Sequence, residues 1–205
     1  MGFSLLVATT LFAFIMSVTP GPNNMMLLAS GAQFGYRNTL PHIFGVIIGV
    51  ALLLSSVLAG LGLIFEMYPV IYEFLKILGS IYLLWLAWKI ATASTAIPEL
   101  GCQEKRAKNK PMTLFSAIAF QFVNPKAWAM AIAAVSTFTL PGDQYLQSSL
   151  LILSAFACTG FIAISLWAYL GASIQQYLTT PSRKRYFNWI MALCTAATLV
   201  LILAD

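Results

Sequence analysis

Two short polar motifs, each built around proline, stand out in a chain that is otherwise strongly apolar. The first is Pro20-Gly21-Pro22-Asn23-Asn24 and the second is Asn124-Pro125-Lys126. Proline has no backbone donor and pushes its predecessor out of the helical region, so each motif predicts a break in a helix. A break leaves carbonyl groups at the end of one helix and N–H groups at the start of the next without intrahelical partners. Both sets of groups are candidates for binding a ligand.

The opposite polarities of such a break suit a zwitterion. A helix N-terminus attracts anions, so we expect a carboxylate at the helix that follows the first break, with Asn23 or Asn24 as its N-cap. We expect the ammonium group on the free carbonyls near Pro20 and on Asn124. A single motif would more often be a plain proline kink. Two matched motifs flanked by asparagine favour a binding site.

Lys126 follows the second motif and lies within an apolar run. A charge inside a membrane is costly, and such a residue is a functional candidate. Its role is either a counter-charge for a carboxylate or a proton carrier, and the alternative is that it snorkels to the cytoplasmic interface. No Asp or Glu lies deep in an apolar run. A neutral zwitterion is therefore favoured over a strongly cationic ligand.

The elements that carry these motifs are membrane spans. The chain is 60% hydrophobic and only 8% charged, whereas soluble domains carry about 25% charged residues. Crossing a bilayer takes about 20 apolar residues. Six runs meet that need: Phe3–Phe34, Ile43–Phe65, Pro69–Trp88, Thr113–Leu140, Ser148–Ala172 and Tyr186–Leu203. As straight helices the first and fourth would be roughly 48 and 42 Å long, against a hydrocarbon core of about 30 Å, which also favours a break in each.

The runs divide into two sets of three around a polar middle stretch. We expect one membrane domain, 1–205, with a first repeat at 1–91, a cytoplasmic linker at 92–112 and a second repeat at 113–205. Three spans per repeat would place the two repeats in opposite orientations. The predicted fold is an all-α integral membrane protein with six transmembrane helices in two inverted three-helix repeats, and with helices 1 and 4 broken at the proline motifs.

The basic residues predict the orientation of the chain. Nine of the eleven fall in or beside the loops after the first, third and fifth runs: Arg37, Lys89, Lys105, Arg106, Lys108, Lys110, Arg183, Lys184 and Arg185. Positively charged short loops stay in the cytoplasm, so both termini should be periplasmic. This distribution also explains the net charge of +5 without a nucleic-acid partner.

These motifs resemble the lysine-exporter (LysE/RhtB) family of bacterial amino-acid exporters. The matching stretches are the two proline motifs, "GYR" at 35–37 and "YLLWLAWKI" at 82–90. The resemblance implies a six-span inner-membrane permease that exports small amino acids or derivatives, by exchange with protons. "FQFVNPKAW" and "VSTFTLP" are similar to the branch that exports cysteine and O-acetylserine. The branch that exports homoserine and threonine stays open.

Two other classes of membrane protein compete with an exporter. A thiol-redox carrier would need a cysteine beside each break, but asparagines stand there, and Cys158 and Cys194 fall in other runs. A non-transporting subunit or assembly factor stays open, although it would not need two polar breaks. With no nucleotide motif and no metal or redox cysteine spacing, we expect no cofactor and no enzyme. The expected partners are an amino-acid substrate, protons and the lipid bilayer, and a homo-oligomer stays open.

Overall fold

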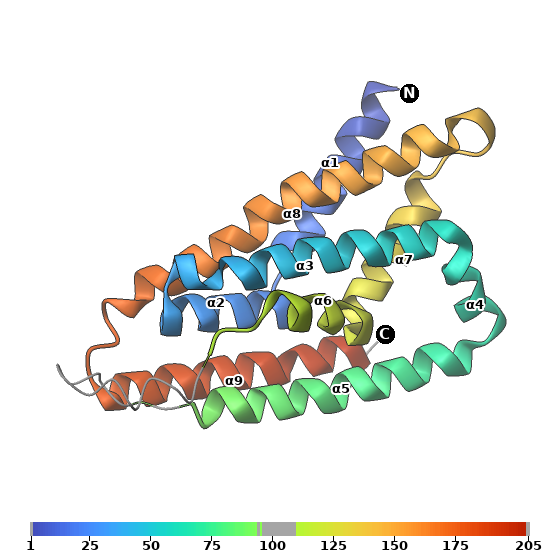
Figure 1. The fold of residues 1–205 in the computed structure, drawn as a ribbon. Coiled ribbons are helices and arrows are strands. Elements are labelled where there is room, and N and C mark those ends of the chain that lie inside the picture. The colour runs from blue at the N-terminus through green and yellow to red at the C-terminus, as the bar shows by residue number, and fades with distance from the viewer. Residues whose placement is uncertain (1, 94, 96–109, 204–205) are drawn as a thin grey trace.

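The chain folds into packed helices, shown in Figure 1. The computed structural model describes residues 2–93, 95 and 110–203, and in these ranges it contains no strand. The elements are α1 (Phe3–Val18), α2 (Pro22–Phe34), α3 (Tyr36–Ser56), the π-helical η1 (Val57–Leu61), α4 (Gly62–Met67), α5 (Pro69–Ala91), α6 (Leu114–Val123), α7 (Pro125–Phe138), the 3-10 turn η3 (Gly142–Gln144), α8 (Tyr145–Gln175) and α9 (Pro181–Leu203). The all-helical prediction is confirmed for these residues. The expected linker, 92–112, lies largely outside them.

Both expected helix breaks are present. The axes of α1 and α2 meet at 57°, and those of α6 and α7 meet at 71°. Each second helix begins with proline at its first position, Pro22 in α2 and Pro125 in α7. Proline suits this position because its missing N–H group has no intrahelical acceptor there and its φ is already helical.

The helices include several that are long and apolar enough to cross a bilayer. Three qualify as they stand: Tyr36–Ile64, Glu73–Ala91 and Gly142–Gln175. The two bent pairs raise the number to as many as five if each pair is one span. The sixth expected run is covered by α9, which is not among these candidates. The chain is therefore a multi-pass membrane protein, and six spans remain a prediction.

The helices of one half of the chain pack against those of the other half. α1 and α2 lie along α8, α6 lies along α3, and α5 pairs with α9 (Figure 1). The backbones of α2 and α8 touch: a Cβ added to Gly171 would overlap the Leu28 carbonyl, and one added to Gly31 would overlap the Ala168 carbonyl. Small residues permit such close approach between membrane helices.

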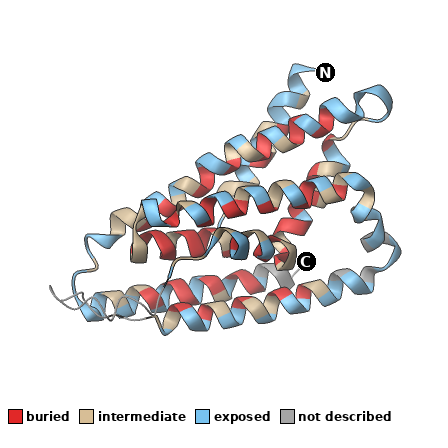
Figure 2. Cartoon of the chain, in the orientation of Figure 1, coloured by how far each residue is buried: buried red, intermediate tan, exposed pale blue. Residues whose placement is uncertain are grey.

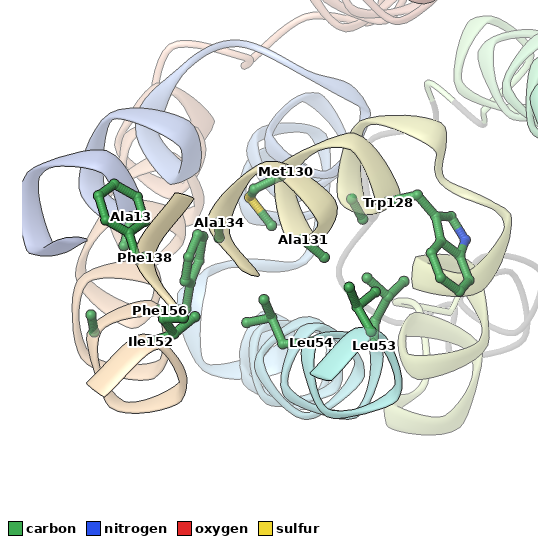
Figure 3. Close-up of a cluster of buried hydrophobic side chains, with 13 residues drawn as sticks. Ala13, Leu53, Leu54, Trp128, Met130, Ala131, Ala134, Phe138, Ile152 and Phe156 are labelled. Atoms are coloured by element: carbon green, nitrogen blue, oxygen red, sulfur yellow. The ribbon is translucent and has the colours of Figure 1, made fainter. Parts of the chain in front are cut away.

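The described buried apolar side chains form four clusters, and two of them, named here the outer and the inner cluster, border the cavity described below. The outer cluster joins α1, α3, α7 and α8 and includes the residues labelled in Figure 3, among them Leu54, Met130 and Phe156. The inner cluster is made of Leu27, Ile43, Val46, Ala117, Ile164 and Ala168. Figure 2 shows that the buried residues face the centre of the bundle, whereas α5 exposes much of its outer surface. The exposed side chains of α5 include Phe74, Ile77, Ile81 and Leu84, as expected for a lipid-facing helix.

The segments that carry most of the described basic residues gather at one end of the molecule. The α2–α3 turn, the C-terminal end of α5, the start of the α6 segment and the α8–α9 turn all lie at the left of Figure 1. Their basic residues are Arg37, Lys89, Lys110, Arg183, Lys184 and Arg185. Lys105, Arg106 and Lys108 lie outside the described residues.

Candidate functional site

The two helix breaks border the same cavity, although more than 100 residues of the chain separate Pro20 from Asn124. Its empty volume, counted with the open mouth, is about 510 Å³. The breaks contribute Gly21, Pro22, Asn23, Asn24, Asn124 and Lys126 to its lining. The other two predicted site residues, Pro20 and Pro125, adjoin these in the chain. The structure thus brings the predicted polar residues of both motifs together.

The carbonyl groups at the end of α1 are already hydrogen-bonded. The Asn24 side-chain amide donates to the carbonyls of Ser17 and Thr19, at 2.8 Å each. The Trp167 indole N–H, from α8, donates to the Val18 carbonyl at 3.1 Å. The sequence predicted free carbonyls near Pro20, and that prediction is wrong for this conformation. These donors come from α2 and α8, and further ones come from Lys126 of α7, described next. The local sequence does not show that α7 and α8 meet the end of α1.

Lys126 reaches across the cavity from the second break to the first. Its Nζ donates to Thr19 Oγ1 at 2.9 Å, to the Thr19 carbonyl at 3.1 Å and to the Pro20 carbonyl at 3.2 Å. An ammonium group has three donors, so these contacts satisfy all of them. A Cβ on Gly21 would lie 2.9 Å from both Nζ and Cδ of this lysine. A larger residue at that position would require the end of the lysine side chain to shift.

The start of α2 differs from the prediction that Asn23 or Asn24 is its N-cap. The N-cap is Gly21, and no side chain caps it. Because Pro22 takes the first helical position, both asparagines fall within the first turn, where backbone N–H groups have no intrahelical acceptor. Asn23 instead pairs with Gln121 of α6: its Nδ2 donates at 2.8 Å, and Gln121 Nε2 donates back to Oδ1 at 3.2 Å.

The second break has a different polar arrangement around Asn124. This residue is only 2% exposed, and its Oδ1 has no hydrogen-bond partner among the residues that the structure describes. Its backbone carbonyl accepts from the N–H groups of Ala127 and Trp128, at 3.0 and 3.3 Å. A buried acceptor without a donor costs about 1 to 3 kcal/mol. Asn124 Oδ1 is therefore suited to accept a hydrogen bond from a ligand.

The apolar walls of the cavity were not identified from the sequence. They are formed mainly by α3 and α8, with smaller parts from α1 and α7. The residues of α3 and α8 are Val46, Ile47, Val50, Phe156, Gly160 and Ile164. The spacing of four residues from Val46 to Val50 and from Phe156 through Gly160 to Ile164 marks one face of each helix. Both faces of a membrane helix are apolar, so the pattern did not show which one meets the cavity. Gln121, which is hydrogen-bonded to Asn23, was also missed. The signal in the sequence was a polar amide within an apolar run, three residues before Asn124.

Two broken helices that meet at a polar cavity between apolar helices are typical of membrane proteins that move small solutes across a bilayer. The chain belongs to the LysE-type translocator family, whose family model matches residues 14–203. It is a multi-pass protein of the inner membrane and not an enzyme.

Several relatives cover nearly the whole chain. The cysteine/O-acetylserine efflux protein of Salmonella typhimurium (strain LT2) is 33% identical over 192 residues, which are 92% of each chain. The protein of the same name from Escherichia coli O6:H1 (strain CFT073) is 32% identical over 193 residues, 93% of each chain. No solved structure is a significant match.

Proposed function

We propose that the chain is a secondary transporter that exports small neutral amino acids or their derivatives from the cytoplasm. One observation carries the proposal: a single cavity brings together two helix N-termini, the Lys126 ammonium and Asn124 Oδ1, which has no partner among the described residues. These groups have the polarity needed to bind both ends of a zwitterion. A plain proline kink would require none of them.

The positive groups suit a carboxylate. Both α2 and α7 begin at the cavity, and the first turn of a helix presents backbone N–H groups with partial positive charge. Asn23 and Asn24 lie in the first turn of α2, and Lys126 lies in that of α7. A carboxylate between these turns would gain from both helix ends and from the lysine charge.

The remaining groups suit an ammonium and a small side chain. Asn124 Oδ1 accepts from the ammonium, and no acidic residue is among the described residues that line the cavity. A second positive charge on the substrate would therefore have no partner. Val50, Phe156 and Ile164 offer apolar contact to the side chain. The cavity thus favours neutral amino acids.

The position of the cavity supports alternating access. Met130 and Phe156 belong both to its lining and to the outer cluster, whereas Val46 and Ile164 belong to its lining and to the inner cluster. The cavity therefore lies between the outer and the inner cluster, and each cluster can act as an apolar seal on one side of it. We propose six spans in which the repeats, 1–91 and 113–205, rock against each other and open one seal at a time. The packing of α1 on α8 and of α6 on α3 is what inverted repeats would give.

The end of the molecule that gathers the basic segments is proposed to face the cytoplasm, with both termini periplasmic. The names of the relatives make cysteine and O-acetylserine the first substrates to test. Homoserine and threonine come next. We further propose that export is exchanged for protons.

The test is efflux from proteoliposomes loaded with cysteine, O-acetylserine, homoserine, threonine and lysine. We expect wild type to release one or more of the neutral amino acids and to retain lysine, and we expect Lys126→Ala to release none. Lys89→Ala is the control, since Lys89 lies over the Trp85 ring, 4.5 Å from its centroid, and is not a cavity residue. If wild type releases no amino acid, the exporter proposal is wrong and a non-transporting subunit is favoured.

Proton exchange is tested in the same vesicles. A pH gradient, acidic on the side that receives the substrate, should speed efflux, and nigericin should remove the effect. Equal rates with and without the gradient would contradict proton coupling while leaving export intact.

A further inference from the structure

The Lys126 ammonium already occupies a cation-binding site. Its three acceptors, which we call the ammonium cradle, are Thr19 Oγ1, the Thr19 carbonyl and the Pro20 carbonyl, all within 3.2 Å of Nζ. The cradle belongs to the first break, and the lysine comes from the second, 107 residues along the chain from Thr19. The site is thus formed by one half of the protein and filled by the other.

The ammonium cradle can bind any primary ammonium group and is not specific for the lysine side chain. A lysine side chain and the amino group of an amino acid both end in a primary ammonium with three N–H donors. Carbonyl and hydroxyl oxygens do not distinguish between them. An amino acid whose ammonium first bonds Asn124 Oδ1 brings into the cavity the same group that the cradle holds, and this ammonium can then pass from Asn124 to the cradle.

We propose that the substrate's ammonium displaces Lys126 from the ammonium cradle, and that the released Lys126 ammonium then pairs with the substrate's carboxylate. The inference rests on the proposed function and adds to it how the substrate is recognised. Before the exchange, one ammonium has three acceptors. Afterwards the cradle holds the substrate's ammonium and Lys126 holds a carboxylate, so no charge is left unpaired.

The path of the lysine side chain links the exchange to the carboxylate site. The atoms Cδ and Nζ of Lys126 lie directly over Gly21, the N-cap of α2. When the side chain withdraws, the first turn of α2 becomes accessible to the carboxylate. One movement thus vacates the cation site and opens the anion site.

This exchange requires both charged groups on one molecule. An amine without a carboxylate fills the cradle but leaves Lys126 inside the membrane without a counter-charge, which is costly. An acid without an amine can pair with Lys126 only if the lysine leaves the cradle, and the three acceptors of the cradle then have no ammonium to bind. The need to pair the Lys126 ammonium in both states therefore makes the site selective for a zwitterion.

The test compares the binding of three related probes to purified protein by equilibrium dialysis. The probes are the amino acid that efflux selects, its decarboxylated amine and its deaminated acid, which for cysteine are cysteamine and 3-mercaptopropionate. Hydrogen bonds to charged groups contribute about 1.5 to 3 kcal/mol, so wild type should bind the amino acid roughly tenfold to hundredfold tighter than the amine.

Lys126→Met should reverse that order. This variant empties the cradle and removes the partner of the carboxylate, so the amine should bind at least as tightly as the amino acid and more tightly than it binds wild type. Lys89→Met should keep the wild-type order. Lys126→Gln, which is also uncharged, serves if Lys126→Met is not recovered as folded protein.

The inference is overturned if the variant loses the amine together with the amino acid, because Lys126 would then be a direct ligand only. It is also overturned if the variant keeps the wild-type order. In both cases the proposed function stands as long as wild type exports an amino acid. If wild type exports none, the proposed function fails first, and the inference fails with it.

Discussion

The two helix breaks look alike in sequence but use their polar groups differently. At the first break, side chains from α2, α7 and α8 donate to the carbonyls that end α1: Asn24, Lys126 and Trp167. At the second break, a single non-helical residue, Asn124, turns the chain by 71° and keeps a buried side-chain oxygen without a partner in the described ranges. At the first break the carbonyls are hydrogen-bonded by side chains of the protein itself. At the second break Asn124 Oδ1 has no donor among the described residues and can accept from a ligand.

The difference separates structural from functional roles. Wherever a polar group is bonded within the protein, its loss should lower stability. Where a buried polar group of a cavity-lining residue lacks a partner, its loss should affect ligand binding and spare the fold. The substitutions below test this contrast, beginning with the largest expected effect.

Replacing the free acceptor should have the largest effect. Asn124→Leu keeps the side-chain shape but removes the proposed contact with the substrate's ammonium, so export should fall roughly tenfold to hundredfold. The melting temperature should stay the same or rise, because an unsatisfied acceptor is removed. Efflux and thermal unfolding in detergent measure the two effects. Asn38→Leu, at an exposed position of α3, is the control. A fall in export that only follows a loss of folded protein would assign Asn124 to structure.

Replacing Asn24, which bonds the carbonyls of the first break, should lower the stability of the folded protein. Asn24→Leu removes the donor to the carbonyls of Ser17 and Thr19. The Ser17 carbonyl loses this donor, whereas the Thr19 carbonyl keeps its bond from Lys126, so the free energy of unfolding should fall by about 2 kcal/mol. Export per folded molecule should change less than in Asn124→Leu. An unchanged melting temperature with abolished export would place Asn24 among the substrate ligands and remove the contrast between the breaks.

Trp167→Phe should give a smaller effect at the same break. Phenylalanine retains the aromatic ring that packs against the inner cluster but lacks the N–H group that bonds the Val18 carbonyl. Loss of one hydrogen bond should lower stability by about 1 kcal/mol, with export retained. Thermal unfolding and efflux of the same preparation check both parts. No change in melting temperature would show that the Val18 carbonyl does not depend on this donor.

Gly160→Ala should have the smallest effect on the fold. Its added Cβ would meet Ile47 Cδ1 at 3.5 Å and Ser17 Oγ at 3.6 Å, which are ordinary contacts. Alanine in place of a mid-helix glycine can add up to about 1 kcal/mol of stability. Because Gly160 lines the cavity, export of the largest accepted amino acid should fall severalfold relative to the smallest. Uniform rates across the panel would place the substrate's side chain elsewhere.

Local sequence was sufficient for the breaks and their polar residues. Proline acts on its own backbone and on its immediate predecessor, so the ends of α1 and α6 could be placed without the fold. It was not sufficient for the hydrogen bonds at those ends. The prediction of free carbonyls near Pro20 failed because Lys126 lies 107 residues from Thr19, and Trp167 lies 149 residues from Val18.

The sequence by itself therefore determined the membrane class, the family, the two broken helices and the identity of most polar residues beside them. Those features follow from apolar run length, from proline chemistry and from motifs that are contiguous in the chain. Only the tertiary structure decided which polar groups are bonded inside the protein and which face the cavity. Hydrogen-bond partners are chosen by distance in space, and here the two halves of the chain supply them to each other.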